Sequence, residues 1–223
     1  MPASRETLEE RRRHLVSVAE CLLREGSGID FSMTELASRA GVSPATPYNL
    51  IGTKADLLAR LLDEEFTRFD RKLSRKARKP GLVGLWDAVD HMLEQYLADP
   101  DFYRALFIAL FRPDTQTFRK LMSERAVSLW GGFIEDALKD EALDAMPSSR
   151  SIGDVFVFQM GSVVYHWALD RWSEERFTNL LRATTRQVIL PHLSGDSAEK
   201  LRKEIVQISG KKRHIRAGAE KIA

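Results

Sequence analysis

The sequence predicts an all-α protein with about nine or ten helices. Apolar residues recur at helical spacing in almost every segment, and the alternation typical of strands is missing over any useful length. Proline and glycine separate the helical segments. With 223 residues, 43% of them hydrophobic, the chain has room for one or two domains and for a core of useful size.

The first helices carry local start and stop signals. An apolar stripe at helical spacing runs through residues 15–22. Ser32, with Glu35 three residues later, forms a capping box that predicts a helix beginning at Met33. Gly41 is placed to end this helix, because glycine accepts the left-handed conformation.

A second short helix follows, which Ser43 can cap, with Pro44 in its first turn. Thr53, with Asp56 three residues on, caps a third and much longer helix that ends at the Pro-Gly pair 80–81. Two short helices joined by a turn that contains glycine form a helix-turn-helix. The remaining helices are long, apart from a short one expected over residues 196–208.

Residues 31–58 resemble the helix-turn-helix of the TetR family of bacterial transcription regulators. The match covers about the first 60 residues; beyond them, only the helical pattern and the total length agree with that family. The resemblance implies an all-α homodimer that binds a near-palindromic operator, usually represses transcription and is released by a small ligand. The matching residues are Phe31, Thr34, Leu36, Ala37, Ala40, Gly41, Val42, Ser43, Thr46, Tyr48, Lys54 and Leu57.

On this basis we expect four parts in the chain. They are a helix-turn-helix domain at 1–53, a connecting long helix at 54–80, a ligand-binding and dimerisation domain at 81–195, and a C-terminal helix with a basic tail at 196–223. The end of the tail is either disordered or adds non-specific affinity for DNA.

The expected DNA contacts lie on or beside the second short helix, the recognition helix. Its short side chains permit close approach to base edges, and Thr46 can offer a hydroxyl to phosphate or a methyl to thymine. By resemblance, Tyr48, Lys54 and Thr34 contact phosphates. In the alternative reading, Ser43 is merely a cap, Tyr48 a core aromatic and Lys54 a solvated charge. The candidate DNA-binding residues are Thr34, Ser43, Ala45, Thr46, Tyr48, Asn49 and Lys54.

Two residues depart from the family pattern. Pro47 stands inside the recognition helix, where it removes a hydrogen bond and disfavours helical geometry at Thr46. We therefore expect this helix to begin as a 3₁₀ turn or to start late. Ile51 replaces an aromatic residue at a position that we expect to belong to the core.

The charge balance limits how the chain can bind DNA. Its net charge is only +2, so it is not a polycation that binds nucleic acid by bulk charge. Any DNA contact must come from a local patch. The arginine cluster at residues 11–13 is either such a patch or a solvated face.

The second half is rich in aromatic residues, which suits an apolar cavity with a few polar groups that orient a ligand. We expect an apolar or aromatic effector, bound among the helices that begin near residues 82, 114 and 151. No cofactor is predicted. The candidate ligand-binding residues are His91, Phe107, Phe111, Trp130, Phe133, Phe156, Gln159, Tyr165 and His166.

Four side chains have alternative roles. His166 and Asp170 are four residues apart and could bind a metal with His91, but a hydrogen-bonded histidine is the simpler interpretation, and we predict no metal site. Cys21, the single cysteine, is expected to be a buried thiol.

Residues 152–167 are apolar on nearly every side, so this helix must be covered all round or face a partner. With the following helix, around residues 177–188, it is the expected homodimer interface. The interface and the ligand cavity would then share a helix.

We therefore predict a ligand-responsive, DNA-binding transcription regulator that acts in the cytoplasm and, by resemblance, is a repressor. One cysteine fits a reducing compartment, and the longest uncharged run, 155–169, is too short to span a membrane. Two alternatives stay open: an α-helical enzyme, although no G-x-S-x-G, H-E-x-x-H or phosphate-binding glycine loop is found, and a DNA-binding interaction protein without a small-molecule ligand.

Overall fold

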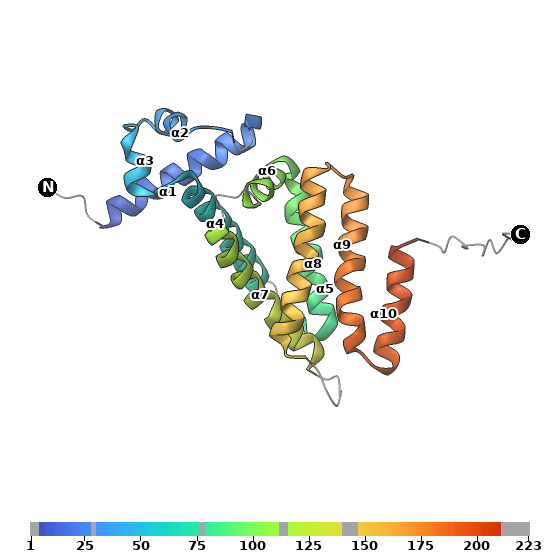
Figure 1. The fold of residues 1–223 in the computed structure, drawn as a ribbon. Helices are drawn as coiled ribbons and strands as arrows, with labels where there is room; N and C mark the ends of the chain where they lie inside the picture. The colour runs from blue at the N-terminus through green and yellow to red at the C-terminus, as the bar shows by residue number, and fades with distance from the viewer. Residues whose placement is uncertain (1–4, 28–29, 76–78, 112–115, 140–146, 211–223) are drawn as a thin grey trace, which may run out of the picture.

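The computed structural model describes residues 5–27, 30–75, 79–111, 116–139 and 147–210, and these residues form an all-helical fold (Figure 1). A π-helical turn at Leu23–Ser27 (η1) and a 3₁₀ turn at Leu190–His192 (η3) accompany the α-helices. None of the described helices is long and apolar enough to cross a membrane. The α-helices are α1 (Arg5–Leu22), α2 (Met33–Arg39), α3 (Ala45–Leu50), α4 (Lys54–Arg75), α5 (Gly81–Ala98), α6 (Pro100–Leu110), α7 (Gln116–Leu138), α8 (Ser149–Leu169), α9 (Glu174–Ile189) and α10 (Gly195–Ile208).

Helices α1 to α3 form a small unit at one end of the molecule, which we call the head (Figure 1). Helix α4 leaves the head and runs beside α7, while α8, α9 and α10 pack in sequence across the larger bundle. The predicted helix over 196–208 is confirmed as α10, one residue longer at its start. The end of the basic tail, residues 211–223, lies outside the described residues.

The predicted caps of α2 and α4 are confirmed. The Ser32 hydroxyl accepts a hydrogen bond from the Glu35 amide at 3.0 Å. At α4, the Asp56 carboxylate accepts from the Thr53 amide, while the Asp56 amide donates to the Thr53 hydroxyl. Each such cap is worth about 1 kcal/mol. Gly41 has φ +66°, which explains glycine at the end of α2.

The cap predicted for α3 is wrong. Pro44, with helical φ −56° and ψ −27°, precedes the first helical residue, and the Ser43 hydroxyl pairs with the Thr46 hydroxyl at 2.8 Å. The Thr46 amide donates to the Ser43 carbonyl, so the helix opens with a 3₁₀-type bond, as expected from Pro47. Pro47 is tolerated because it lies in the first turn, where backbone amides have no partner within the helix.

One burial prediction also needs correction. Cys21 is exposed, because the buried face of α1 is formed by Leu15, Ala19 and Leu22, and residue 21 points elsewhere. Helix α8 is not covered on every side within one chain, since Phe158 is 79% exposed, which leaves the alternative that this helix faces a partner. Ile51 is buried, as predicted.

Ion pairs join the head to the bundle. The Arg68 guanidinium of α4 donates two hydrogen bonds to the Glu20 carboxylate of α1, at 3.1 and 3.3 Å. Arg68 also pairs with Glu65 at 2.6 Å. On the other side, Arg24 pairs with Glu20 and with Asp99, which caps α6. A charged chain therefore spans α1, α4 and the start of α6.

Substitution Glu20→Gln tests this junction through its pH dependence. Burial raises the pKa of Glu20, but hydrogen bonds from Arg68 and Arg24 outweigh burial and hold the pKa below its ordinary value. The carboxylate therefore stabilises the fold above the unfolded pKa, and this contribution is lost as the pH falls through the folded pKa.

We expect Glu20→Gln to lower the free energy of unfolding in urea at about pH 7, and the loss to shrink toward about pH 3.5. Glu10→Gln, at an exposed position of the same helix, is the matched control and should have little effect at either pH. An effect of Glu20→Gln that is independent of pH would contradict this assignment.

Candidate DNA-binding surface and ligand cavity

The recognition helix α3 presents one face to solvent. Ala45, Tyr48 and Asn49 are exposed, and their spacing places them on a common helical face. Tyr48 is 54% exposed, an unusual position for a tyrosine unless its ring meets another surface. Pro47 turns the opposite way and is buried. Helix α3 therefore buries Pro47 on its inner side and exposes short side chains and one phenol on its outer side.

The other candidate contacts surround this face. Thr34 in α2 and Ser43 before α3 are exposed, and Thr46 is half-buried through its contact with Ser43. Lys54 differs: its ammonium donates to the Phe31 carbonyl at 2.5 Å and lies over the Phe31 ring. Lys54 thus ties the start of α4 to the segment before α2.

Arg12 has a role that the sequence did not reveal. Its Nε donates to the Leu50 carbonyl at 2.9 Å, at the last residue of α3. A cation at the C-terminus of a helix satisfies a free carbonyl and favours the helix dipole. Arg11 and Arg13, its neighbours, are exposed. The arginine cluster therefore divides into one residue that fixes the recognition helix and two that face solvent.

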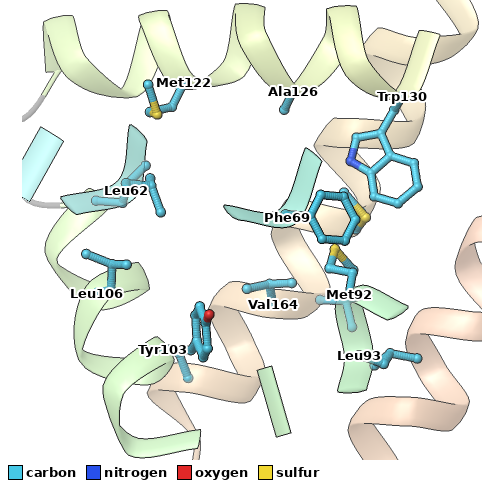
Figure 2. Packing of buried hydrophobic residues seen from close by; sticks show 14 of the residues in the cluster. Leu62, Phe69, Met92, Leu93, Tyr103, Leu106, Met122, Ala126, Trp130 and Val164 are labelled. Atoms are coloured by element: carbon cyan, nitrogen blue, oxygen red, sulfur yellow. The ribbon is translucent and has the colours of Figure 1, made fainter. Parts of the chain in front are cut away.

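A cavity of about 970 Å³ lies among α4, α5, α6, α7 and α8. Figure 2 shows Leu62, Phe69, Met122, Ala126 and Trp130 from its walls turned toward a common interior. The wall is mostly aromatic and aliphatic. Its polar members are Glu65, Gln95, Tyr96, Tyr103, Arg119, Ser123, Asp154, Ser162 and Tyr165.

Four of the nine candidate ligand residues line this cavity: Phe107, Phe111, Trp130 and Tyr165. Phe107 lies on α6, and Phe111 directly follows that helix. Trp130 lies on α7 and Tyr165 on α8. The rings of Phe111 and Tyr165 are in contact, with centroids 4.3 Å apart and planes tilted by 51°. These aromatic groups could hold a flat or elongated apolar ligand.

The other five do not line it. Phe133 and Phe156 are buried against Trp130, with ring centroids at 5.8 and 5.3 Å, so they support the wall from behind. His91 stacks on Phe69 and faces Glu94, and Gln159 is exposed on α8.

His166 is also outside the cavity. Its Nδ1 lies 3.2 Å from the Asp170 carboxylate, and its ring stacks on Trp172. This is the hydrogen-bonded histidine of the simpler interpretation. No group of three or more metal-ligating side chains occurs within the described parts of the chain.

The polar groups that the cavity does contain cluster around Glu65, which is 5% exposed. Its Oε2 accepts hydrogen bonds from the Tyr103 hydroxyl at 2.5 Å and from Gln95 Nε2 at 3.1 Å. Gln95 Nε2 also donates to the Tyr103 oxygen at 2.7 Å. Burial and the hydrogen bond to Glu65 raise the pKa of Tyr103, so its phenol stays protonated. We call Glu65, Gln95 and Tyr103 the polar corner.

A sequence signal for this corner exists. Glu65 follows Leu58, Leu61 and Leu62 at the helical spacing of the buried stripe of α4, where an apolar residue is expected. A carboxylate at a core position requires partners, and Gln95 and Tyr103 supply them.

Comparison with known proteins places this architecture among transcription regulators. No family model matches the sequence. A curated relative, the HTH-type transcriptional regulator HbdR of Aromatoleum sp. (strain CIB), is 24% identical over 173 residues, which cover 74% of this chain and 72% of that protein.

Two solved structures share the fold. Thermus thermophilus FadR, a TetR-family repressor in complex with lauroyl-CoA, superimposes with a TM-score of 0.65 at 18% identity, covering 83% of this chain and 96% of FadR. A TetR-family transcriptional regulator from Marinobacter aquaeolei VT8 gives a TM-score of 0.56 at 13% identity, over 88% and 98% of the two chains. These relatives are regulators, not enzymes. With its helix-turn-helix head and helical bundle, the chain has the fold of the TetR-family transcriptional regulators.

Proposed function

We propose that the protein is a sequence-specific DNA-binding transcription regulator that acts as a repressor and is released from its operator by a small apolar or aromatic ligand. The observation that carries this proposal is the position of α4. Its first residue, Lys54, is fixed to the helix-turn-helix, and Glu65, Phe66 and Phe69 further along line the cavity. Helix α4 thus connects the head directly to the candidate ligand site.

The exposed face of α3 supports the DNA-binding half of the proposal. In a helix-turn-helix, the second helix enters the major groove with its N-terminal side chains toward the bases. Asn49 has the amide that pairs with adenine, and Tyr48 has a hydroxyl for phosphate. Thr34, Ser43, Ala45 and Thr46 complete the proposed contact surface; for Lys54, binding to phosphate would compete with its bond to Phe31.

The cavity supports the ligand-responsive half. Its volume favours a ligand-binding regulator over an interaction protein with a packed core. A ligand there would touch α4 and α6, and each of these helices is also in contact with the N-terminal part of the chain. Helix α6 reaches it through Asp99 and Phe102, which hold Arg24 by an ion pair and a cation–π contact. A shift of either helix would therefore move α1 and the recognition helix.

One side of α8 supports a homodimer. Val155, Phe158 and Leu169 share this side and are all exposed, and Leu180 of α9, which packs against α8, is exposed as well. Val155 and Phe158 also line the cavity, so the proposed interface borders its opening. Clustered apolar exposure of this kind marks interaction sites. A two-fold axis beside α8 and α9 would present two copies of α3 to successive turns of a near-palindromic operator.

The four parts, 1–53, 54–80, 81–195 and 196–223, remain our proposed division of the chain. The cytoplasm remains the proposed location of the protein.

We expect Asn49→Ala and Tyr48→Phe to separate base recognition from phosphate binding. Asn49→Ala should reduce the preference for operator over scrambled DNA by about 1–3 kcal/mol, because it removes a base contact. Tyr48→Phe should weaken binding to both DNAs by a similar factor, because a phosphate contact has no sequence information.

Fluorescence anisotropy with DNA from upstream of the gene, over a salt series, measures both effects. Ser209→Ala, which removes an exposed hydroxyl at the end of α10, outside the head and the cavity, is the control for Tyr48→Phe. Unchanged binding of both head variants would exclude α3 as the DNA-reading helix.

We expect Phe158→Asp to convert the dimer to a monomer, because it places a charge in the proposed apolar interface. Val206→Asp introduces the same change at a residue of α10 that is 51% exposed, and should leave the dimer intact. Sedimentation velocity at several protein concentrations distinguishes these outcomes. A Phe158→Asp protein that sediments as a dimer would place the interface elsewhere.

A further inference from the structure

The polar corner of the cavity has all its hydrogen-bond donors in use. The Tyr103 hydroxyl carries one proton, which it donates to Glu65. The Gln95 amide donates to Glu65 and to the Tyr103 oxygen, which occupies both of its N–H groups. The Glu65 carboxylate has no proton to donate when ionised. These three residues therefore have no donor left for a ligand.

One acceptor oxygen of the corner remains open. Gln95 Oε1 is buried and accepts no hydrogen bond within the described structure. Glu65 Oε1 lies 2.6 Å from the Arg68 guanidinium, whose charge compensates for it. A buried acceptor without a donor is costly, so Gln95 Oε1 favours a bound group that supplies one.

The orientation of the Gln95 amide is set by its neighbours. A flipped amide would place its oxygen against the Glu65 carboxylate and the Tyr103 oxygen, where two acceptors would meet. The open acceptor at Gln95 therefore follows from the network around Glu65. Tyr96, the next residue of α5, also lines the cavity, but a hydroxyl can donate as well as accept and does not discriminate between ligands.

The charge of the surroundings points the same way. The ion-paired chain Asp99–Arg24–Glu20–Arg68–Glu65 contains three carboxylates and two guanidiniums, so it has one negative charge in excess, and the cavity wall adds Arg119 and Asp154, one charge of each sign. An anionic ligand group at the corner would lie beside this excess charge. A neutral or cationic donor would not meet that repulsion.

We propose that the ligand of this cavity has an apolar body and brings a hydrogen-bond donor, a hydroxyl or an ammonium group, to Gln95 Oε1. A ligand that enters with a carboxylate end is disfavoured. This inference rests on the proposed function only in taking the cavity as the effector site, and it names the chemistry of the ligand end that reaches α4 and α5.

Four probes with one aromatic body and different head groups test the proposal: pyrenemethanol, pyrenemethylamine, methoxymethylpyrene and pyrenecarboxylate. Fluorescence titration into the full chain gives a dissociation constant for each. We expect the alcohol and the amine to bind at least about tenfold more tightly than the methyl ether, which has no donor, and the carboxylate to bind most weakly.

Substitutions in the corner should change this order. Gln95→Met removes the open acceptor and should abolish the advantage of the alcohol over the ether. Glu65→Gln replaces the charge with an amide that can donate, and should improve binding of the carboxylate relative to the alcohol. Met122→Leu, at an apolar wall position on α7, should change all four affinities by the same factor. Thermal unfolding checks that each variant is folded; if Glu65→Gln is not, Gln95→Met alone decides.

Equal affinities for the alcohol, ether and carboxylate would overturn the donor rule while leaving a ligand-binding regulator in place. Failure of all four probes to bind would overturn both the inference and the cavity as an effector site. Operator binding by the unliganded protein is measured separately, so loss of the DNA-binding function would be recognised independently of either result.

Discussion

A single ionised side chain inside an apolar bundle constrains much of this structure. Removing a carboxylate from water costs several kcal/mol unless charges and donors compensate for it. Glu65 finds that compensation on three helices: Arg68 on α4 itself, Gln95 on α5 and Tyr103 on α6. These contacts fix how the three helices sit along one another. Apolar residues of similar volume could fill the same space, so stability alone does not explain a carboxylate at this position.

Because Arg68 is shared with Glu20, the same constraint extends into the head. Any group that alters the environment of Glu65 changes the balance of charge on Arg68, and through it the hold of α4 on α1. Arg24 makes a parallel connection from α1 to the start of α6. The head is thus held at two points, each attached to a helix of the cavity wall, and a ligand can act on both without touching the recognition helix.

Local chemistry explains which features the sequence could predict. Caps such as Ser32 and Thr53 act within three residues, and the glycine turn at Gly41 depends on one backbone angle, so both were visible in the sequence. The 3₁₀-type start of α3, which Pro47 led us to expect, follows the same logic. The direction of a polar side chain in the bundle depends instead on which helices pack around it. Hence His166 and Gln159, which were predicted as ligand-binding residues from their polarity, lie outside the cavity. Glu65 lines the cavity but was not predicted, because it occupies a position in the apolar stripe of α4.

The exposed thiol of Cys21 has a practical consequence. It is the only cysteine in the sequence and lies on α1, next to Glu20, which forms the ion pair with Arg68 of α4. A spin label or fluorophore attached there would need no engineered site and would mark each head once. In a homodimer, the distance between the two labels would report directly on the spacing of the recognition helices, with and without ligand, on a molecule of natural sequence.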